Sequence, residues 1–370
     1  MNSVVFITNN PREERIEVFD ELSRIAEFRL EVVYLRKYVF SRRWTEFFKP
    51  RHNYKIFSHF TVYKHFYLNF NVISHLKKLN PDLVIITQYS NLTYQQVMLY
   101  LSSKNIPWVF WGETPYVKYD DILFNNFFLR KILRKLLVYQ IKKNALEIWP
   151  IGLTAKKSYQ QLLGKQAKVL DSVPYTSNLE KFTPSPKEFS KPKILFCNSL
   201  SHRKGFDLFI QSLDILQKRD LNFSVMVVGY GEYERNLINF IENSTVDIQY
   251  LGFVEKSEIP MIYNSCDILV YPSRHDGWGM GVSEGLASGL AVISTKYVGS
   301  SNEIIKNKKN GFLIDTLDGD SIANAIEFCI KNPLETKKIA SQGLLDIQKY
   351  SHTQGARNFY NLIKNLKLSN

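Results

Sequence analysis

The stretch from Asp267 to Thr295 constrains the fold more than any other part of the sequence. It begins with a short apolar run, Ile268 to Tyr271, which is typical of a buried parallel strand. A glycine-rich loop and a short helical segment follow, and a second apolar run, Ala291 to Ser294, predicts the next strand. A helix that begins directly after a glycine-rich loop presents free backbone N–H groups and the positive end of its dipole. This order predicts an α/β fold with an anion-binding site at the loop.

Two acids flank the glycine-rich loop, eight positions apart. Asp276 lies in the loop and Glu284 lies on the helix, so both can face the same ligand. Three glycines, Gly277, Gly279 and Gly281, let the backbone approach that ligand closely. The alternative is a βαβ turn whose glycines only make a tight connection, and a glycine-rich turn by itself does not decide between the two.

The whole stretch resembles the E-x7-E signature of retaining glycosyltransferases of family 4, which have the GT-B fold. Asp276 stands where most members carry the first glutamate, and Asp-Gly-Trp-Gly resembles a variant of bacterial polysaccharide and lipopolysaccharide enzymes. The resemblance implies two Rossmann-like β/α/β domains that face a central cleft, with a C-terminal helix that crosses back to the first domain. It also implies transfer from a nucleotide-diphosphate sugar without a metal ion or another cofactor.

The length of 370 residues also predicts two domains. Apolar strands alternate with helical segments in both halves, which is typical of doubly wound parallel sheets. A polar segment rich in Ser, Pro and Lys separates the halves and has the composition of a linker. We therefore expect an N-terminal acceptor-binding domain over residues 1–173, a linker over 174–192, a C-terminal nucleotide-sugar-binding domain over 193–350 and a crossover helix within 351–370.

Two parts of the first domain have informative patterns. The basic, aromatic region over residues 36–70 is expected to form helical pieces. Residues 127–143 predict a basic amphipathic helix. Five residues are expected on the apolar side of that helix: Leu129, Ile132, Leu133, Leu136 and Leu137.

The C-terminal domain is expected to bind the donor. By the resemblance, Arg203 and Lys204 are catalytic cations that stabilise the leaving diphosphate, with a surface basic pair as the alternative. Asp276 would lie near the donor-sugar hydroxyls, and Glu284 would accept hydrogen bonds from the ribose. Ser199 takes the position of the arginine that is usual in the family. The resemblance implies further donor contacts at Gly229, Val254, Gly279, Met280, Gly281 and Val282.

The N-terminal domain is expected to bind the acceptor. The turn after its first strand faces the cleft in the family, so Asn9, Asn10 and Arg12 are candidates, with a plain capping turn as the alternative. Glu113 stands where the family often supplies a histidine, and it is the candidate for holding an acceptor or sugar hydroxyl. It could accept a proton only if burial raises its pKa, and the alternative is a neighbour of a helix N-cap. Thr114, the next residue, is a further acceptor-binding candidate.

No pattern in the sequence makes a convincing metal site. Asp318-Gly319-Asp320 imitates the D-x-D motif of another glycosyltransferase fold, but its position predicts a turn and a helix N-cap. The pair Asp120-Asp121 is isolated.

The net charge of +13 lies mostly in the first half of the chain. Between Arg36 and Lys78 the only acid is Glu46, and aromatic residues are frequent. Such a mixture is typical of an anionic membrane surface or of a nucleic-acid site, or it is a solvated face over core aromatics. No RRM or KH signature accompanies it, so we expect a membrane surface as partner and no nucleic acid.

The cysteines and the termini bear on location. Cys197, Cys266 and Cys329 lie in apolar contexts without C-x-x-C spacing, which predicts buried free thiols in a reducing compartment. The sequence has no signal-peptide pattern and no apolar run of about 18 residues. We expect a cytoplasmic protein that binds peripherally to the inner face of the plasma membrane.

These observations predict a retaining glycosyltransferase that uses a nucleotide-diphosphate sugar. Its expected acceptor is a glycan or a polyprenyl-diphosphate-linked chain in bacterial cell-surface polysaccharide synthesis. Two alternatives remain: a GT-B epimerase that acts on a nucleotide sugar, and a nucleic-acid-binding protein without enzymatic activity.

Overall fold

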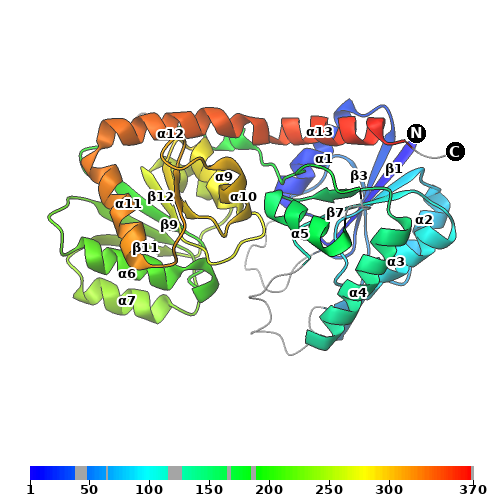
Figure 1. Ribbon diagram of the computed structural model, residues 1–370, viewed down its shortest axis with the longest axis horizontal. Helices are drawn as coiled ribbons and strands as arrows, with labels where there is room; N and C mark the ends of the chain where they lie inside the picture. Colours follow the sequence, from blue (N-terminus) through cyan, green and yellow to red (C-terminus); the bar gives the residue numbers. More distant parts are fainter. Residues whose placement is uncertain (38–47, 64–65, 116–126, 165–167, 185–188, 368–370) are drawn as a thin grey trace. The chain divides into compact units, whose positions relative to one another are not determined.

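The structure is a computed structural model of the chain, and it describes all residues except 38–47, 64–65, 116–126, 165–167, 185–188 and 368–370. For residues 62–66 and 127–131 it describes no side chains. The chain divides into two compact units, which Figure 1 shows with their helices and strands labelled. Unit 1 consists of Met1–Thr176 and His352–Asn370, and unit 2 consists of Ser177–Ser351.

Unit 1 is built on a parallel sheet in which six strands follow the order β3-β2-β1-β6-β7-β8. A separate antiparallel pair joins β4 and β5. The strands are β1 (Ser3–Thr8), β2 (Arg29–Tyr34), β3 (Asn53–Ile56), β4 (Phe60–Tyr63), β5 (Phe66–Leu68), β6 (Leu83–Ile86), β7 (Trp108–Gly112) and β8 (Ile148–Pro150). The helices are α1 (Glu13–Ile25), α2 (Val72–Leu79), α3 (Leu92–Ser103), α4 (Phe127–Asn144), α5 (Leu153–Leu163) and α13 (His352–Asn365).

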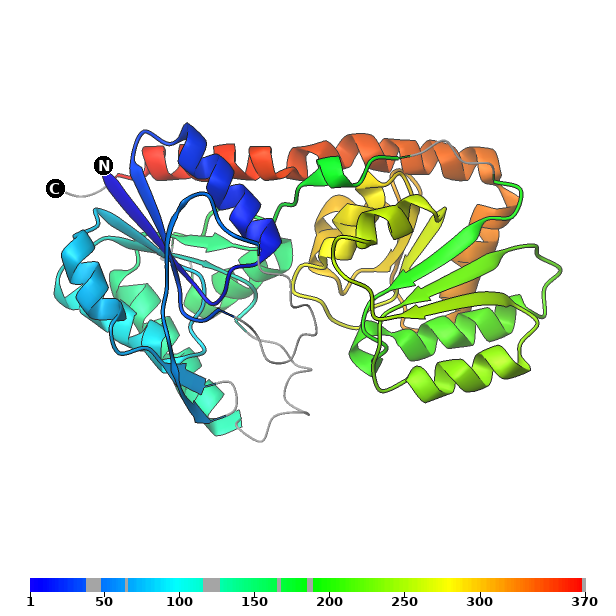
Figure 2. The same ribbon diagram turned by 180° about the vertical axis from the view of Figure 1, so that it is seen from behind.

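Helices cover both faces of the unit 1 sheet (Figures 1 and 2). On one face, the ring of Phe6 in β1 packs against Phe19 of α1 and Phe359 of α13, with centroids 4.8 and 5.5 Å apart. On the other face, Val5 and Ile7 belong to a core shared with α2, α3, α4 and α5. Successive residues of β1 therefore point to opposite faces, as the pleat of a strand requires.

The region over residues 36–70 differs from its sequence-based expectation. Helical pieces were expected, but the described residues of this region form the strands β3, β4 and β5. β3 adds to the sheet beside β2, with Tyr54 opposite Val32. Aromatic residues fit a pleated surface well, which explains why this aromatic-rich region forms strands.

Helix α4 also differs in the side that it buries. Leu133, Leu137 and Ile141 are buried, whereas Ile132 and Leu136 are 38% and 43% exposed. The buried residues recur every four positions and form one stripe. The expectation that Ile132 and Leu136 lie on the buried side was therefore wrong. Leu129, which was expected there as well, is not among the residues whose side chains the structure describes.

Unit 2 repeats the same architecture, with the strand order β11-β10-β9-β12-β13-β14 in a parallel sheet. Its strands are β9 (Lys193–Cys197), β10 (Ser224–Val228), β11 (Asp247–Gly252), β12 (Ile268–Tyr271), β13 (Ala291–Thr295) and β14 (Phe312–Ile314). Its α-helices are α6 (Phe206–Leu216), α7 (Glu234–Asn243), α8 (Ile259–Asn264), α9 (Met280–Ala287), α10 (Gly299–Ile304), α11 (Gly319–Lys331) and α12 (Pro333–Ile347). Three short 3₁₀ turns are η1 (Leu179–Lys181), η2 (His202–Lys204) and η3 (Gln348–Tyr350).

The unit 2 sheet is likewise covered on two faces. Ile194 and Phe196 of β9 belong to the core that the sheet forms with α6 and α11. α9 packs directly on the sheet, because a Cβ atom at Gly285 would lie 2.5 Å from the side chain of Leu269 in β12. The glycine allows the helix to approach the strands closely.

Both sheets contain a point at which the strand order reverses. It lies between β1 and β6 in unit 1 and between β9 and β12 in unit 2. In open parallel sheets, ligands bind beyond the carboxyl ends of the strands at this point. The loops that follow β9 and β12 in unit 2, and β1 in unit 1, are therefore the first places to look for a site.

Among the helices formed by described residues, none has both the length and the apolar character needed to cross a bilayer.

Candidate functional site

In unit 2, the loops after β9 and β12 are in direct contact. η2 ends at Gly205, which has a φ of +70° and begins α6. A Cβ atom at this position would lie 2.0 Å from the carbonyl oxygen of Pro272, the residue that follows β12. Only glycine combines the positive φ with this close approach. The way the two loops meet therefore requires glycine at position 205.

Arg274 holds the same two loops together. Its Nη1 and Nη2 atoms donate to Oδ1 and Oδ2 of Asp207 on α6, each at 2.6 Å. Nη1 also donates to the carbonyl oxygen of His202 at 2.7 Å. A bidentate arginine–carboxylate pair fixes orientation as well as distance. Sequence analysis missed this pair, because its members are 67 positions apart and no motif joins them.

Lys204, Asp276 and Tyr271 form the centre of the site. Lys204 is 7% exposed, and its Nζ lies 2.5 Å from Asp276 Oδ2 and 3.4 Å from the Tyr271 hydroxyl. The Tyr271 hydroxyl donates to the same Asp276 oxygen at 2.7 Å. The Lys204 ammonium also lies 5.4 Å from the centroid of the Tyr271 ring, within cation–π range.

The electrostatics of this centre favour an ionised aspartate. Burial raises the pKa of the Asp276 carboxyl, but the Lys204 ammonium, the hydrogen bonds from Lys204 and Tyr271, and the charge of Arg203 lower it more. The net pKa therefore lies below the usual value of 3.8. Lys204 and Asp276 were predicted from the sequence as separate site residues. Tyr271 was not predicted as a site residue, because in the sequence it is only a tyrosine at the end of an apolar run.

Arg203 and Ser199 lie in the connection between β9 and α6. Arg203 is exposed, and its Nη1 donates to the carbonyl oxygen of His275 at 3.1 Å. Ser199 is exposed, and its Oγ lies 3.2 Å from Oγ of Ser201. Both predicted donor residues are therefore at the carboxyl edge of the sheet.

The start of α9 lies against Tyr271. Gly279 is the N-cap with a φ of +87°, and as a glycine it supplies no side-chain cap to the first N–H groups. A Cβ atom at Gly281 would lie 2.8 Å from the Tyr271 ring. Met280 is half-buried and Val282 is fully buried, so the side chain of Val282 belongs to the core, and its backbone N–H donates to the carbonyl oxygen of Gly279 at 3.2 Å.

Glu284 is half-buried on α9 and faces the ends of the neighbouring strands. Burial and the charge of Glu284 raise the pKa of the Cys197 thiol at the end of β9. Burial, Asp276 and Glu284 likewise raise the pKa of the Tyr271 hydroxyl. The two acids of the predicted motif therefore act on the same tyrosine, so the structure brings them together.

The remaining donor candidates lie on the β10 and β11 side. Gly229 has a φ of +128°, and a Cβ atom there would lie 1.9 Å from the carbonyl oxygen of Asn198. The end of β10 therefore packs on the loop after β9. Val254 is half-buried and follows Phe253, whose ring centroid lies 5.9 Å from that of Tyr230.

The acceptor candidates after β1 in unit 1 already have protein contacts. Asn9 Oδ1 accepts hydrogen bonds from the hydroxyls of Tyr67 and Tyr94, at 2.5 and 3.1 Å. Asn10 is buried, with 9% of its surface exposed. Arg12 is the N-cap residue of α1, and its Nη1 lies 3.9 Å from Glu14 Oε1. Asn9 is thus held in place, and Arg12 remains partly accessible at 34% side-chain exposure.

Glu113 and Thr114 follow β7 and are half-buried. The hydroxyl of Tyr159 donates to the carbonyl oxygen of Glu113 at 2.7 Å. A Cβ atom at the preceding residue, Gly112, would lie 2.4 Å from the Phe110 ring. The contact at Gly112 and the hydrogen bond to the Glu113 carbonyl group therefore hold the backbone at Glu113 in place.

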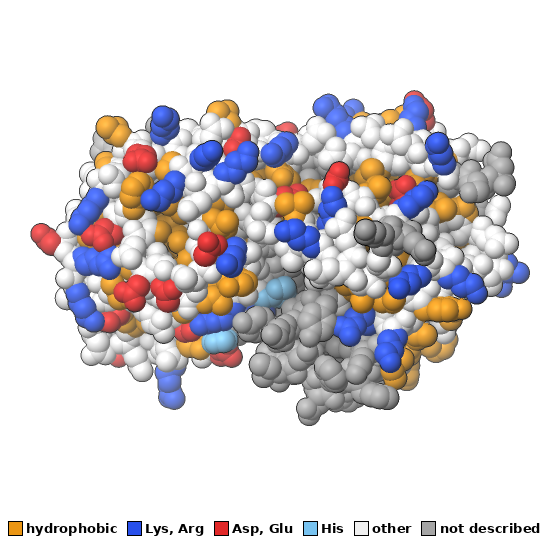
Figure 3. Space-filling view, viewed as in Figure 1, with side chains coloured by type: hydrophobic (Ala, Val, Ile, Leu, Met, Phe, Trp, Pro, Cys, Tyr) orange, Lys and Arg blue, Asp and Glu red, His pale blue; other side chains and the backbone are white. Residues whose placement is uncertain are grey.

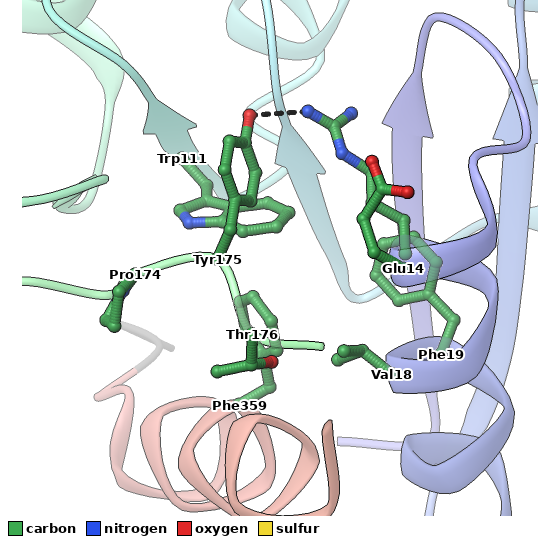
Figure 4. Close-up of a pocket in the computed structure, with 9 residues that line it drawn as sticks. Glu14, Val18, Phe19, Trp111, Pro174, Tyr175, Thr176 and Phe359 are labelled. Atoms are coloured by element: carbon green, nitrogen blue, oxygen red, sulfur yellow. Dashed lines mark hydrogen bonds between the residues drawn. The ribbon is translucent and has the colours of Figure 1, made fainter. Parts of the chain in front are cut away.

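A buried arginine in unit 1 was missed by sequence analysis. Arg15 of α1 is 6% exposed, and its Nη2 donates to the Tyr175 hydroxyl at 2.5 Å, as the dashed line in Figure 4 marks. Its Nη1 donates to Oγ1 of Thr8 at the end of β1. The guanidinium carbon lies 4.9 Å from the ring centroid of Tyr175 and 5.6 Å from that of Trp111. Position 15 shares a helical face with the buried Phe19, four positions on, and this spacing was the available signal.

The groups around Arg15 line a small hollow (Figure 4). Its volume of about 10 Å³ is close to the space that one water molecule needs. The hollow is thus too small for a substrate, and the side chains that line it contact one another.

Within the described ranges, no three His, Cys, Asp or Glu side chains are grouped as a metal site would require. The Asp318 side chain accepts a hydrogen bond from the backbone N–H of Ser321 at 2.6 Å. The expectation of an N-cap at Asp318 is therefore confirmed.

Comparisons with known proteins find similar sequences and similar structures. Residues 178–344 match the glycosyl transferases, group 1. An uncharacterised glycosyltransferase of Methanocaldococcus jannaschii is 29% identical over 158 residues, which are 42% of this chain and 43% of the relative. The O-antigen chain mannosyltransferase B of Escherichia coli is 24% identical over 161 residues, 42% of each chain. The matched stretch therefore spans less than half the length of these relatives.

A solved structure extends the likeness to the whole chain. The crystal structure of Anabaena Alr3699/HepE in complex with UDP has a TM-score of 0.77 and 16% identity, and the match covers 99% of this chain and 100% of that one. At this identity the likeness concerns the fold. The expected GT-B fold, with two Rossmann-like α/β units, is thereby confirmed.

The group 1 match includes the donor candidates but not the acceptor candidates. Lys204, Asp276 and Glu284 lie inside the matched residues. Asn9 and Glu113 lie outside them, in the part of this GT-B chain for which only the fold is shared.

Proposed function

We propose that this protein is a retaining glycosyltransferase of family 4 that uses a nucleotide-diphosphate sugar. The observation that carries the proposal is the buried contact of Lys204, Asp276 and Tyr271 beside the start of α9. Its position at the point of strand reversal in unit 2 is where an open parallel sheet binds ligands. Alr3699/HepE has been solved with UDP and with UDP-glucose, which supports a nucleotide-sugar donor.

In this proposal the donor diphosphate lies at the N-terminus of α9, where backbone N–H groups and the helix dipole favour negative charge. Lys204 is already paired with Asp276, whereas Arg203 donates to the neutral carbonyl group of His275. Arg203 therefore has more of its charge available for the leaving diphosphate. Asp276 holds donor-sugar hydroxyls, and Glu284 holds the ribose.

The transfer is a substitution at the anomeric carbon. The bond from that carbon to the β-phosphate oxygen breaks, and the acceptor oxygen bonds to the same face of the carbon. The acceptor proton passes to the released phosphate. In this proposal Arg203 and the N-terminus of α9 offset the phosphate charge, so no metal ion or other cofactor is required. Fixed positive groups stabilise the developing phosphate charge without reorganising.

The proposed acceptor is a glycan or a polyprenyl-diphosphate-linked chain in bacterial cell-surface polysaccharide synthesis. The O-antigen mannosyltransferase among the relatives supports this class of acceptor. Unit 1 would bind it through Asn9, Asn10, Arg12, Glu113 and Thr114, the polar residues after β1 and β7.

The test is a titration of the purified protein with UDP-glucose, UDP-N-acetylglucosamine and GDP-mannose, in the presence of EDTA. We expect one of them to bind and Arg203→Ala to weaken that binding at least tenfold. Arg235→Ala, which removes an exposed arginine on α7, is the matched control and should leave it unchanged. The anomeric configuration of the product, read by NMR, then tests retention. Absence of any nucleotide-sugar binding would contradict the proposal, and an epimerised sugar or oligonucleotide binding would favour the alternatives.

We further propose that the protein works in the cytoplasm, at an anionic membrane surface, and docks through α3 and α4. Leu99, Ile132, Leu136 and Tyr139 are between 38% and 57% exposed on these two helices. α3 and α4 contact each other through the hydrogen bond from Ser102 to Gln140, so the two helices that carry these side chains are neighbours.

The charge of this surface fits an anionic partner. None of the helices α2, α3 and α4 contains an aspartate or a glutamate. Lys135, Lys142 and Lys143 are exposed on α4, and Figure 3 shows Lys, Arg and hydrophobic side chains interspersed over this part of unit 1. Apolar side chains that insert at the interface, together with lysines that attract anionic headgroups, are typical of peripheral membrane proteins.

A vesicle sedimentation experiment tests the surface. We expect the protein to sediment with vesicles of 30% phosphatidylglycerol in phosphatidylcholine at low salt, and to be released by 0.5 M NaCl. Leu136→Glu should reduce the bound fraction severalfold, whereas Leu345→Glu, at a leucine of α12 that is 67% exposed, should not. Equal effects of the two variants would contradict docking through α3 and α4.

A further inference from the structure

Two polar residues of unit 1, Asn9 and Arg36, are neighbours just beyond the carboxyl ends of β1 and β2. The backbone N–H of Leu35 donates to the carbonyl oxygen of Thr8 at 3.0 Å. One residue further along, the N–H of Arg36 donates to the carbonyl oxygen of Asn9 at 2.9 Å, so the pairing of the two strands continues to these residues. They lie next to the point between β1 and β6 where the strand order reverses. Open parallel sheets bind ligands at such a point.

The side chain of Asn9 has its oxygen occupied and its nitrogen available. Oδ1 accepts hydrogen bonds from the hydroxyls of Tyr67 and Tyr94, at 2.5 and 3.1 Å, and both tyrosines are buried. Two donors on one oxygen fix which way the amide group points, and they leave Nδ2 with its two N–H groups. Asn9 is half-buried, and no group in the described part of unit 1 accepts a hydrogen bond from Nδ2.

Arg36 is held by the same tyrosine. Its guanidinium carbon lies 5.1 Å from the centroid of the Tyr67 ring, within cation–π range. Tyr67 therefore contacts Arg36 with its ring and Asn9 with its hydroxyl, and it places the two polar side chains around one fixed group. The backbone N–H of Tyr67 donates to Asn91 Oδ1 at 3.1 Å, which fixes the tyrosine itself.

The guanidinium of Arg36 has a donor that lacks an acceptor. Its Nε atom is buried, and no described group accepts a hydrogen bond from it. A buried donor without an acceptor destabilises the folded state, so such an atom calls for a partner. Arg36 is half-buried as a residue, and part of its side chain is therefore accessible to a ligand.

The chemistry of these groups selects an anion. A guanidinium has five N–H donors and no acceptor, and the nitrogen of Asn9 is also only a donor. Among the side chains that the structure describes, no carboxylate forms an ion pair with Arg36. The planar fork of an arginine matches the oxygens of a phosphate group and can bind two of them at once.

We propose that Asn9 and Arg36 form a binding site for a phosphate group of the acceptor. The inference deepens the proposed function, and it rests on that function only in assigning the phosphate to the acceptor. Of the two classes of acceptor proposed above, it selects the one that carries phosphate or diphosphate. It also adds Arg36 to the acceptor site, while Tyr67 holds both donors in place without contacting the ligand.

Calorimetric titration with pyrophosphate, in the presence of EDTA, tests the site. All proteins carry Arg203→Ala, which weakens the diphosphate site proposed in unit 2. We expect saturable binding, and Arg36→Gln should weaken it at least tenfold, the effect of one lost hydrogen bond to a charged group. Arg29→Gln is the matched control. It removes an exposed arginine at the opposite end of the same strand, β2, and should leave the affinity unchanged.

Asn9→Asp is a second variant that keeps the fold. An aspartate still offers an oxygen to the hydroxyls of Tyr67 and Tyr94, but it replaces the N–H donors by a negative charge. This variant should also weaken pyrophosphate binding at least tenfold. Equal affinities of the parent protein, Arg36→Gln and Asn9→Asp, or no saturable binding to the parent protein, would overturn the inference.

Thermal unfolding separates binding from a structural role. Arg36→Gln removes a buried donor that has no acceptor, so its midpoint without ligand should not fall below that of the parent protein. Pyrophosphate should raise the midpoint of the parent protein and not that of the variant. A midpoint that falls in Arg36→Gln, with an unchanged response to pyrophosphate, would mean that Arg36 only stabilises the fold.

Two further probes distinguish the source of the phosphate. One is a phosphatidylcholine vesicle that contains a small share of a polyprenyl diphosphate, and the other is glucose 6-phosphate. We expect the vesicles to bind and Arg36→Gln to reduce the bound fraction severalfold, whereas binding of glucose 6-phosphate through Arg36 would assign the site to a soluble phosphorylated acceptor. If Arg36→Gln changed the binding of neither probe, the assignment to an acceptor phosphate would be wrong. Failure of the proposed function looks different, because the wild-type protein would then bind no nucleotide sugar, whatever its response to pyrophosphate.

Discussion

Lys204 and Asp276 form an ion pair inside unit 2, with Nζ 2.5 Å from Oδ2 and side-chain exposures of 9% and 18%. The two residues are 72 positions apart and follow different strands, β9 and β12. Because both charges are largely withdrawn from water, each offsets the desolvation of the other. The pair therefore matters for stability as well as for the proposed donor site.

Removing one member of the pair is expected to destabilise unit 2 strongly. Lys204→Met keeps much of the side-chain volume but leaves the ionised Asp276 without its cation. Loss of one partner of a buried ion pair costs about 3–5 kcal/mol, which urea unfolding at pH 7 would measure. The double variant Lys204→Met, Asp276→Asn should recover most of that loss, because it buries no uncompensated charge.

The matched control is an exposed ion pair of the same unit. Lys218 Nζ lies 2.7 Å from Asp214 Oδ2, with side-chain exposures of 69% and 48%. Lys218→Met should change the free energy of unfolding by less than about 1 kcal/mol. If the two methionine variants were equally stable, Lys204 and Asp276 would not depend on each other in the way that their burial indicates.

The lowered pKa of Asp276 also predicts how stability depends on pH. Its folded-state pKa lies below the unfolded value of 3.8, so its contribution is present above pH 3.8 and is lost as pH falls through the folded pKa. Asp276→Asn cannot titrate at this position. We therefore expect the stability difference between wild type and Asp276→Asn to be constant above about pH 5 and to shrink in more acidic solution. Urea unfolding of both proteins between pH 2.5 and 7 measures this, and a difference that grows towards low pH would contradict it.

The sequence was sufficient to predict the fold and the place of the donor candidates, because local patterns predict parallel α/β sheets and residues 267–295 resemble a motif of GT-B enzymes. Apolar strand runs that alternate with helices predict a parallel sheet, and its strand ends define where ligands bind. Lys204 and Asp276 could be identified because the stretches that contain them resemble motifs of family 4 glycosyltransferases. Their contact with each other could not, because it depends on side-chain directions across 72 positions.

The features that sequence analysis missed share one physical cause. Arg274 binds Asp207, and Arg15 binds Tyr175, through tertiary contacts that no local period records. The buried side of α4 was predicted only in part, because adjacent apolar residues, such as Ile132 and Leu133, define two possible stripes. The packing of α4 against the core of unit 1 selects between them.

Gly205 is expected to tolerate no side chain. A Cβ atom there meets the backbone carbonyl of Pro272 at 2.0 Å, and backbone atoms cannot move aside as the end of a side chain can. Gly205→Ala should therefore separate the two loops, lower the thermal midpoint by several degrees and weaken nucleotide-sugar binding at least tenfold. Differential scanning calorimetry and the donor titration would measure the two effects.

Gly164 provides the control for backbone strain alone. Its φ of +76° is close to the +70° of Gly205, but a Cβ atom there meets nothing within 4 Å. Gly164→Ala should show only the cost of placing a side chain at a φ of +76° and a ψ of −179°, which glycine alone adopts readily, about 1–3 kcal/mol, and should leave donor binding intact. A Gly205→Ala protein that resembled Gly164→Ala in both measurements would mean that the loop contact is not needed.

The packing of α13 on unit 1 depends on Phe359. Its side chain is 2% exposed, and its ring centroid lies 4.8 Å from that of Trp111 and 6.0 Å from that of Trp149. Replacing a buried phenylalanine by alanine costs about 3–5 kcal/mol, because it removes apolar contacts and leaves a cavity. Phe359→Ala should therefore shift the urea unfolding of unit 1 to lower concentration, as followed by tryptophan fluorescence. Leu345→Ala, at an exposed position of α12, should change the free energy of unfolding by no more than about 0.5 kcal/mol. If the two variants unfolded at the same urea concentration, the C-terminal helix would not stabilise unit 1 through this aromatic contact.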